Sequence, residues 1–255
     1  MPRWVHVESE DHVAIVTLQR GPVNAMHQPM YAEVKEVFDA LSADEALRVV
    51  ILTGAGEKAF QAGNDVEEFL TLTPETAEHR LEVMRDCFKS IYECSVPVIA
   101  AINGPAIGTG LALAAEADFI LASENAFFSL PEIDVGIIGG ARHAFRIFPQ
   151  MKVRRMFYTA ERITAYQAYQ WGAIEAVVPQ NDLLPEAIKL AKAIARRSPL
   201  MIRYAKKSLN KIEWLDLREG YEYEQSLTAK LSGRLDPKEA VRAYLEKREP
   251  NFLGR

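Results

Sequence analysis

The chain has 255 residues, of which 49% are hydrophobic, and this length suits one large domain or a domain with a helical appendage. Its net charge of −5 lacks the basic footprint of a nucleic-acid-binding protein, and no apolar run approaches the roughly 18 residues that span a membrane. The two cysteines, Cys87 and Cys94, form no C-x-x-C pattern, and the N-terminus carries no secretory apolar region. We therefore expect a cytoplasmic protein without a nucleic-acid or membrane partner.

The first hundred residues predict strands that alternate with helices. Residues 4–8 and 12–18 favour a starting hairpin that turns near residues 10–11. Apolar spacing predicts helices at residues 30–41 and 74–94, and apolar runs predict buried strands at residues 49–53 and 96–102. Loops are expected between these elements, where glycines interrupt the apolar patterns.

The second part of the chain predicts fewer strands and more helices. The expected strands are residues 119–122, 126–130 and 176–178, and the expected helices are residues 111–117, 153–159, 165–171, 183–196, 199–211, 215–232 and 237–247. Strands that alternate with helices indicate an α/β core with a substantially parallel or mixed sheet. The C-terminal helices carry apolar stripes that need burial, so we expect them to cover the core or to form subunit contacts.

The glycine-rich stretch at residues 103–112 links a predicted buried strand to a predicted helix. Glycines allow a sharp bend and a close approach to a ligand, and such a turn can present amides to an oxygen that becomes negative during a reaction. Two other interpretations are a purely structural turn and a dinucleotide site. The dinucleotide pattern fails at Leu113, where a small residue is required.

Six segments taken together resemble the enoyl-CoA hydratase/isomerase (crotonase) superfamily, and the similarity runs along nearly the whole chain. They are PVNAM at residues 22–26, AFQAGND at 59–65, AINGPA at 101–106, LPEIDVGI at 130–137, WG at 171–172 and EKREPNF at 246–252. The resemblance implies an α/β fold, with a crotonase-like spiral of ββα units over residues 1–195 and a C-terminal helical trimerisation region over residues 196–255. It also implies an acyl-CoA thioester substrate, no cofactor beyond the coenzyme A of that substrate, and a homotrimer or a hexamer.

In this family two backbone amides from separated turns hold the thioester oxygen, and the resemblance places them at Asn64 and Thr109. Only the N–H groups are needed, so these residues can stand where the family usually has Ala and Gly. Proton transfer beside a thioester carbonyl places enolate charge on its oxygen, and one preorganised donor commonly lowers such a barrier by roughly 3–4 kcal/mol. The resemblance further implies that coenzyme A contacts the backbone at Asn24, Ala25, Met26, Ala62, Gly63 and Gly108.

Hydratases of this family use two glutamates, and the first of them has no counterpart here. Its position holds Ala112, whose methyl group cannot transfer a proton. Glu116 lies one helical turn further on the same face and is the nearest candidate substitute. We favour a structural role for Glu116, as a carboxylate that is paired or that caps a neighbour.

The second glutamate corresponds to Glu132. We expect the apolar neighbours Leu130, Ile133 and Val135 to remove water from its carboxyl group and to raise its pKa. A single glutamate suffices to shuttle one proton, as in the isomerases of the family. It also suits lyases or modified hydratases that admit a water or a small anion beside Ala112.

Arg142 and His143 stand where small residues commonly begin a helix that borders the acyl pocket. His143 can titrate near neutrality and serve as a second acid or base. Arg142 can bind a substrate carboxylate, or pair with Glu132 and lower its pKa. The alternatives are an exposed helix start and a packing histidine. The other histidines show no metal-ligand spacing, so no metal site is expected.

These observations predict an acyl-CoA-processing enzyme that stabilises a thioester enolate with one catalytic glutamate. The reaction is either isomerisation or a lyase or modified hydratase reaction. The alternative is a catalytically silent crotonase-fold protein that binds coenzyme A or RNA, and the missing glutamate at Ala112 is its only support in the sequence.

Overall fold

The structure is a computed structural model that describes residues 4–254, and it contains two β-sheets. The strands are β1 (Val5–Glu10), β2 (Val13–Leu18), β3 (Val49–Gly54), β4 (Val98–Ile102), β5 (Ala106–Ile107), β6 (Phe119–Ser123), β7 (Phe127–Ser129), β8 (Ile163–Thr164) and β9 (Ala176–Val178). The larger sheet has the order β1-β2-β3-β4-β6-β9, and the smaller has the order β5-β7-β8. Only the β1–β2 hairpin of the larger sheet is antiparallel, so the predicted, substantially parallel sheet is confirmed.

The helices follow the predicted order along the chain. They are α1 (Gln28–Ala43), α2 (Pro74–Tyr92), α3 (Thr109–Ala115), α4 (Ala141–Ala144), α5 (Gln150–Thr159), α6 (Ala165–Gln170), α7 (Leu183–Ala195), α8 (Pro199–Ile212), α9 (Leu217–Leu231) and α10 (Leu235–Glu246), with 3₁₀ turns η1 (Val66–Thr71), η2 (Glu132–Val135) and η3 (Gln180–Asp182). Apolar periodicity did not predict α4, β5 or β8, because elements of two to four residues are too short to show a period. Within residues 4–254, no helix is both long and apolar enough to cross a membrane.

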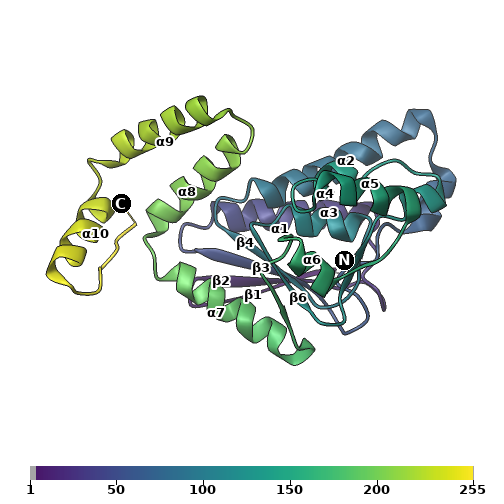
Figure 1. Ribbon diagram of the computed structural model, residues 1–255, viewed down its shortest axis with the longest axis horizontal. Helices are drawn as coiled ribbons and strands as arrows, with labels where there is room; N and C mark the ends of the chain where they lie inside the picture. The colour runs from purple at the N-terminus through teal and green to yellow at the C-terminus, as the bar shows by residue number, and fades with distance from the viewer. Residues whose placement is uncertain (1–3, 255) are drawn as a thin grey trace.

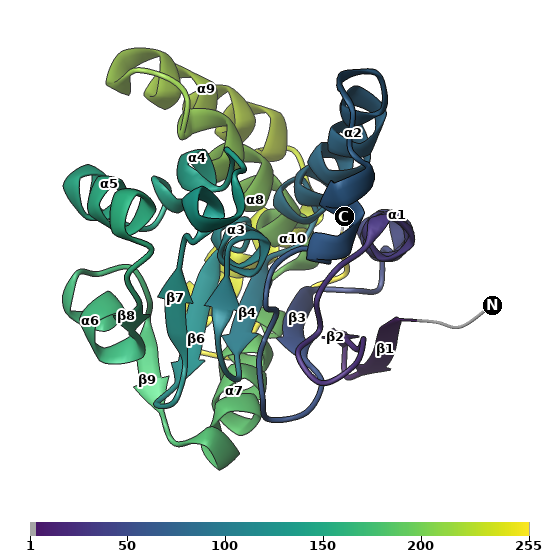
Figure 2. The same cartoon turned by 90° about the vertical axis from the view of Figure 1, so that its right-hand side faces the viewer.

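The larger sheet is covered on both faces (Figure 2), with α1, α2 and α3 on one face and α7 on the other. Successive residues of β3 point to opposite faces, as the pleat of a strand requires. Val50 and Leu52 therefore pack in the large core beneath α1 and α3, whereas Val49 and Ile51 pack against α7. This two-sided burial explains why the central strands read as continuous apolar runs.

The last three helices, α8 to α10, extend beyond the edge of the sheet (Figure 1). Lys206 of α8 anchors them to the core, since its ammonium group lies 2.7 and 2.8 Å from the carboxylate oxygens of Asp118 and is only 4% exposed. The same carboxylate accepts a hydrogen bond of 2.8 Å from the N–H of Val98 at the start of β4. The division into a core of residues 1–195 and a helical region of residues 196–255 stays a prediction.

Replacing Asp118 by Asn should destabilise the protein, because it leaves the buried ammonium group of Lys206 without a counter-charge. The expected loss is about 3–5 kcal/mol in the free energy of unfolding, measured by urea denaturation. Asp39→Asn is the matched control, since Asp39 pairs with Lys35 at 2.6 Å on the surface and should lose no more than about 1 kcal/mol. Equal losses in the two variants would contradict the anchoring role of Asp118.

Candidate active site

Two loops that are distant in the sequence run side by side next to the larger sheet. Met26 N–H donates to the carbonyl of Gly63 at 3.0 Å, and Asp65 N–H donates to the carbonyl of Met26 at 2.7 Å. Ala62 N–H donates to the carbonyl of Val23 at 3.1 Å. Backbone hydrogen bonds therefore join the two segments expected to contact coenzyme A, residues 24–26 and 62–64, side by side.

The side chain of Asn24 fixes the position of the first of these segments through hydrogen bonds inside the protein. Its side chain is fully buried, and its Nδ2 donates to the carbonyls of Ala55 and Ala59, each at 3.0 Å. Its Oδ1 accepts from the N–H of Arg20 at 3.1 Å. The carboxamide of Asn24 is thus used inside the protein. Asn24 and Met26 are both 0% exposed, so Ala25 is the partly exposed residue of this segment.

The loop of residues 61–64 also contacts the glycine-rich turn of residues 106–110. Ile107 N–H donates to the carbonyl of Gln61 at 3.0 Å, and Gln61 pairs with Ala106 in an isolated bridge. A Cβ atom on Gly110 would come within 2.1 Å of the same carbonyl oxygen, so no other residue fits at this position. The turn that carries Asn64 and the turn that carries Thr109 are consequently joined by direct backbone contacts.

The two amides predicted to hold the thioester oxygen have no acceptor within residues 4–254. Their neighbours in the chain are bonded: Gly63 N–H donates to Oε1 of Gln61, and Gly108 N–H donates to the carbonyl of Ser129, both at 2.9 Å. The N–H groups of Asn64 and Thr109 are therefore free for a ligand at the junction of the two turns.

Glu132, the first residue of η2, lies against the turn that precedes Thr109. A Cβ atom built on Gly108 would be 3.3 Å from Oε1 of Glu132, and one built on Gly140 would be 2.6 Å from it. Both glycines have positive φ angles, of 53° and 76°. The carboxyl group of Glu132 is thus packed between two turns that require glycine.

Burial raises the pKa of Glu132 to about 7. Its Oε2 atom is buried and has no hydrogen-bond partner among the described residues. Leu130 is buried beside it, as predicted, but Ile133 and Val135 are 47% and 52% exposed. The expected contribution of these two residues to the desolvation of Glu132 is wrong, because the short η2 turn directs them towards solvent. The turns at Gly108 and Gly140 pack against the carboxyl group of Glu132 and exclude water from it instead.

The structure brings His143 to Glu116. His143 Nδ1 hydrogen-bonds Oε1 of Glu116, whose side chain is 7% exposed, and Nη1 of Arg146 lies 3.7 Å from Oε2 of Glu116. The imidazole packs on Phe88, with ring centroids 4.8 Å apart, and keeps 31% of its surface exposed. Glu116 is therefore an ion-paired carboxylate that orients His143 at the end of α3.

Arg142 does not pair with Glu132. Its guanidinium group lies 4.6 Å from the ring centroid of Trp214, and the described residues contain no ion pair to Glu132. The predicted pairing between Arg142 and Glu132 is wrong, because α4 turns the arginine towards the C-terminal helices instead.

Sequence reasoning missed two side chains that shape the donor turns. The side chain of Gln61 closes its own turn with a hydrogen bond, in which Nε2 donates to the carbonyl of Gly63 at 2.6 Å. Tyr31 of α1 donates from its hydroxyl group to Oδ1 of Asn64. Tyr31 occupies an apolar position of the helical pattern, and nothing in that pattern signals which distant residue its hydroxyl group reaches.

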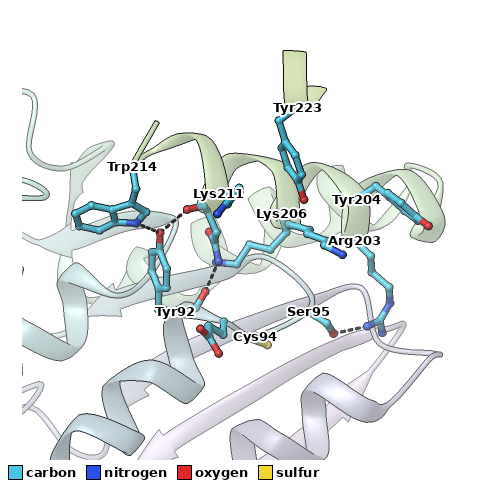
Figure 3. Close-up of a pocket in the computed structure, with 12 residues that line it drawn as sticks. Tyr92, Cys94, Ser95, Arg203, Tyr204, Lys206, Lys211, Trp214 and Tyr223 are labelled. Carbon is cyan, nitrogen blue, oxygen red and sulfur yellow. Dashed lines mark hydrogen bonds between the residues drawn. The ribbon is translucent and has the colours of Figure 1, made fainter. Parts of the chain in front are cut away.

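A cavity of about 760 Å³ lies elsewhere, between the end of α2 and the helices α8 and α9 (Figure 3). Its aromatic walls include Tyr92, Trp214 and Tyr223. None of the predicted catalytic residues lines it. Cys94, at its floor, precedes β4, whereas the donor turn follows β4. The cavity is therefore separate from the site at Glu132.

The chain is similar to known proteins over nearly its full length. The family model described as enoyl-CoA hydratase/isomerase matches residues 8–255. A (7aS)-7a-methyl-1,5-dioxo-2,3,5,6,7,7a-hexahydro-1H-indene-carboxyl-CoA hydrolase from Mycobacterium tuberculosis is 36% identical, over 88% of this chain and 90% of that protein. A crotonyl-CoA hydratase from Syntrophomonas wolfei is 32% identical, over 98% of this chain and 97% of that protein.

Among solved structures, an enoyl-CoA hydratase from Bacillus anthracis superposes with a TM-score of 0.94 at 32% identity, over 99% of this chain and 100% of that chain. This match confirms the crotonase fold that the sequence motifs predicted. The full-length family match and the close structural agreement lead to one conclusion: the chain belongs to the enoyl-CoA hydratase/isomerase (crotonase) superfamily.

Proposed function

We propose that the protein binds an acyl-CoA thioester and transfers a proton at the carbon next to the carbonyl group. The N–H groups of Asn64 and Thr109 would hold the carbonyl oxygen, and Glu132 would carry the proton. One arrangement supports this proposal above all: two unbonded amides on adjoining turns, with a desolvated carboxyl group packed against one of those turns. The two relatives described above are named for reactions of CoA thioesters, which agrees with this substrate class.

The proposed reaction begins when the thioester oxygen accepts hydrogen bonds from both amides. The ionised carboxylate of Glu132 then removes a proton from the adjacent carbon, and the electrons of that C–H bond move towards the carbonyl oxygen. Each amide opposes the developing enolate charge and commonly contributes roughly 3–4 kcal/mol to the barrier reduction. Glu132 afterwards returns its proton to the substrate, and the carboxylate is restored.

Ala112 restricts the reaction to proton transfer by one glutamate. We therefore propose isomerisation, or a lyase or modified hydratase reaction, in place of hydration by two glutamates. His143 is the proposed second acid or base, with Glu116 holding its ring through Nδ1. Incubation with 3-enoyl-, 2-enoyl- and hydroxycinnamoyl-CoA in deuterated water would distinguish these reactions by the product and by the carbon that gains deuterium.

The coenzyme A moiety would lie along the backbone of residues 24–26 and 62–63 and beside Gly108, since these segments adjoin the two donor turns. No further cofactor is part of the proposal. A reducing, cytoplasmic setting is proposed as well, because Cys87 and Cys94 are both free and buried.

Replacing Glu132 by Gln should abolish the proton transfer and leave thioester binding intact, because the amide group is of similar size but is not a base. The exchange of the α-hydrogens of butyryl-CoA with deuterated water, followed by mass spectrometry, should slow by at least about 100-fold. Asp134→Asn is the matched control, since Asp134 belongs to the same η2 turn but is exposed, and it should exchange at the wild-type rate. Exchange that persists in Glu132→Gln would remove Glu132 as the base.

The exchange rate should rise with pH and reach half of its maximum at about pH 7, the raised pKa of Glu132. The rate rises with pH because below about pH 7 the carboxyl group of Glu132 is protonated and cannot accept a proton. The same rise of the exchange rate with pH should persist in His143→Gln. An exchange rate that stays constant or falls over this pH range would contradict the assignment to Glu132. Loss of the rise in His143→Gln would assign the titrating group to His143 instead.

We also propose a homotrimer or a hexamer. The C-terminal helices expose large apolar side chains, with Leu217 91%, Tyr244 84% and Leu245 74% exposed, and assembly would bury such residues. Light scattering of the purified protein should therefore give three or six times the mass of one chain. The mass of a single chain at micromolar concentration would contradict this proposal.

A further inference from the structure

The side chain of Tyr31 is completely buried and reaches the turn that carries Asn64. Its hydroxyl group donates a hydrogen bond to Oδ1 of Asn64. One buried phenol therefore contacts the side chain of a residue whose amide is proposed to hold the thioester oxygen.

Tyr31 is itself held rigidly. It lies on the buried face of α1 together with Met30, Val34 and Phe38, all of which are fully buried. The ring of Phe88 meets the ring of Tyr31 edge to face, with centroids 6.3 Å apart. A buried phenol with so little room to move can hold the turn that contacts its hydroxyl group in one position.

We propose that Tyr31 is a positioning residue, whose hydroxyl group holds the side chain of Asn64 and thereby sets the direction of the N–H group of that residue. The proposal rests on the proposed function, in which this N–H group binds the thioester oxygen together with that of Thr109.

The need for such a contact follows from the chemistry of asparagine. A free carboxamide competes for nearby backbone groups and can pull a turn into another conformation. Two donors must both point at one oxygen, and a displacement of about 1 Å can cost about 100-fold in rate. Because Tyr31 engages the carboxamide oxygen of Asn64, it removes this competition at the turn of residues 61–64.

The same contact accounts for one departure from the small residues usual in the family. Asn64 has a side chain that can hydrogen-bond, and it accepts from the hydroxyl group of Tyr31. Alanine would offer this hydroxyl group no partner, whereas a buried tyrosine hydroxyl group requires one. The two residues are therefore expected to act as a unit.

The test compares Tyr31→Phe, which removes only the hydroxyl group, with the parent protein in a Glu132→Gln background that prevents turnover. Infrared spectroscopy of bound [1-¹³C]butyryl-CoA reports how strongly the amides polarise the carbonyl group. We expect a carbonyl shift to lower frequency in the parent, and loss of most of that shift in Tyr31→Phe. With Glu132 intact, the kcat of α-hydrogen exchange should fall about 10- to 100-fold in Tyr31→Phe, with KM changed by less than about threefold.

Two controls separate positioning from a structural role. Phe38→Leu removes part of a buried ring from the same helix, and it should lower stability without altering the carbonyl frequency. In the Asn64→Ala background, Tyr31→Phe should have no further effect on frequency or kcat, because the hydroxyl group no longer has a partner to position.

Three outcomes would overturn the proposal: a carbonyl shift and kcat that Tyr31→Phe leaves unchanged, an equal change in Phe38→Leu, or a full Tyr31→Phe effect in the Asn64→Ala background. Failure of the proposed function is distinguishable from these, because the parent protein itself would then leave the carbonyl frequency of the bound thioester at its value in water.

Discussion

The backbone contact between Gln61 and the turn of residues 106–110 is the constraint on which the candidate site depends. The carbonyl of Gln61 accepts from Ile107 N–H and leaves no room for a side chain at residue 110. The contact lies between β4 and α3 on one side and the loop before η1 on the other, so two otherwise independent turns cannot move apart without breaking it. The two unbonded amides therefore lie on turns that are fixed to each other without a ligand, and stabilisation of a developing charge requires such preorganisation.

Glu132 illustrates how this arrangement prepares a group for chemistry at the expense of stability. A buried carboxyl oxygen without a hydrogen-bond partner destabilises the folded state, and the raised pKa expresses the same unfavourable desolvation. Gly108 and Gly140 make it possible, because only residues without a Cβ atom allow the carboxyl group so close to two turns. Strongly perturbed groups of this kind gather at functional sites, whereas a structural carboxylate such as Glu116 is paired.

The charged residues behind the site connect it to the C-terminal helices. Arg146 lies 3.7 Å from Glu116, donates to Glu213 beyond α8 at 2.9 Å, and covers the ring of Tyr92 at the end of α2. Because Glu116 also hydrogen-bonds His143, one network of polar side chains reaches from His143 to the residue that follows α8.

The sequence by itself determined the order of the elements, the parallel sheet and the family, because apolar periodicity and short motifs are local properties of the chain. It also indicated the direction of the pKa shift of Glu132, since that carboxyl group follows the buried Leu130. Only the tertiary structure decided that Ile133 faces solvent, that Arg142 stacks on Trp214 and that Tyr31 reaches Asn64. Periodicity shows which face of an element is buried, but the partner of a long polar side chain depends on how distant elements pack, and that packing is a property of the whole fold.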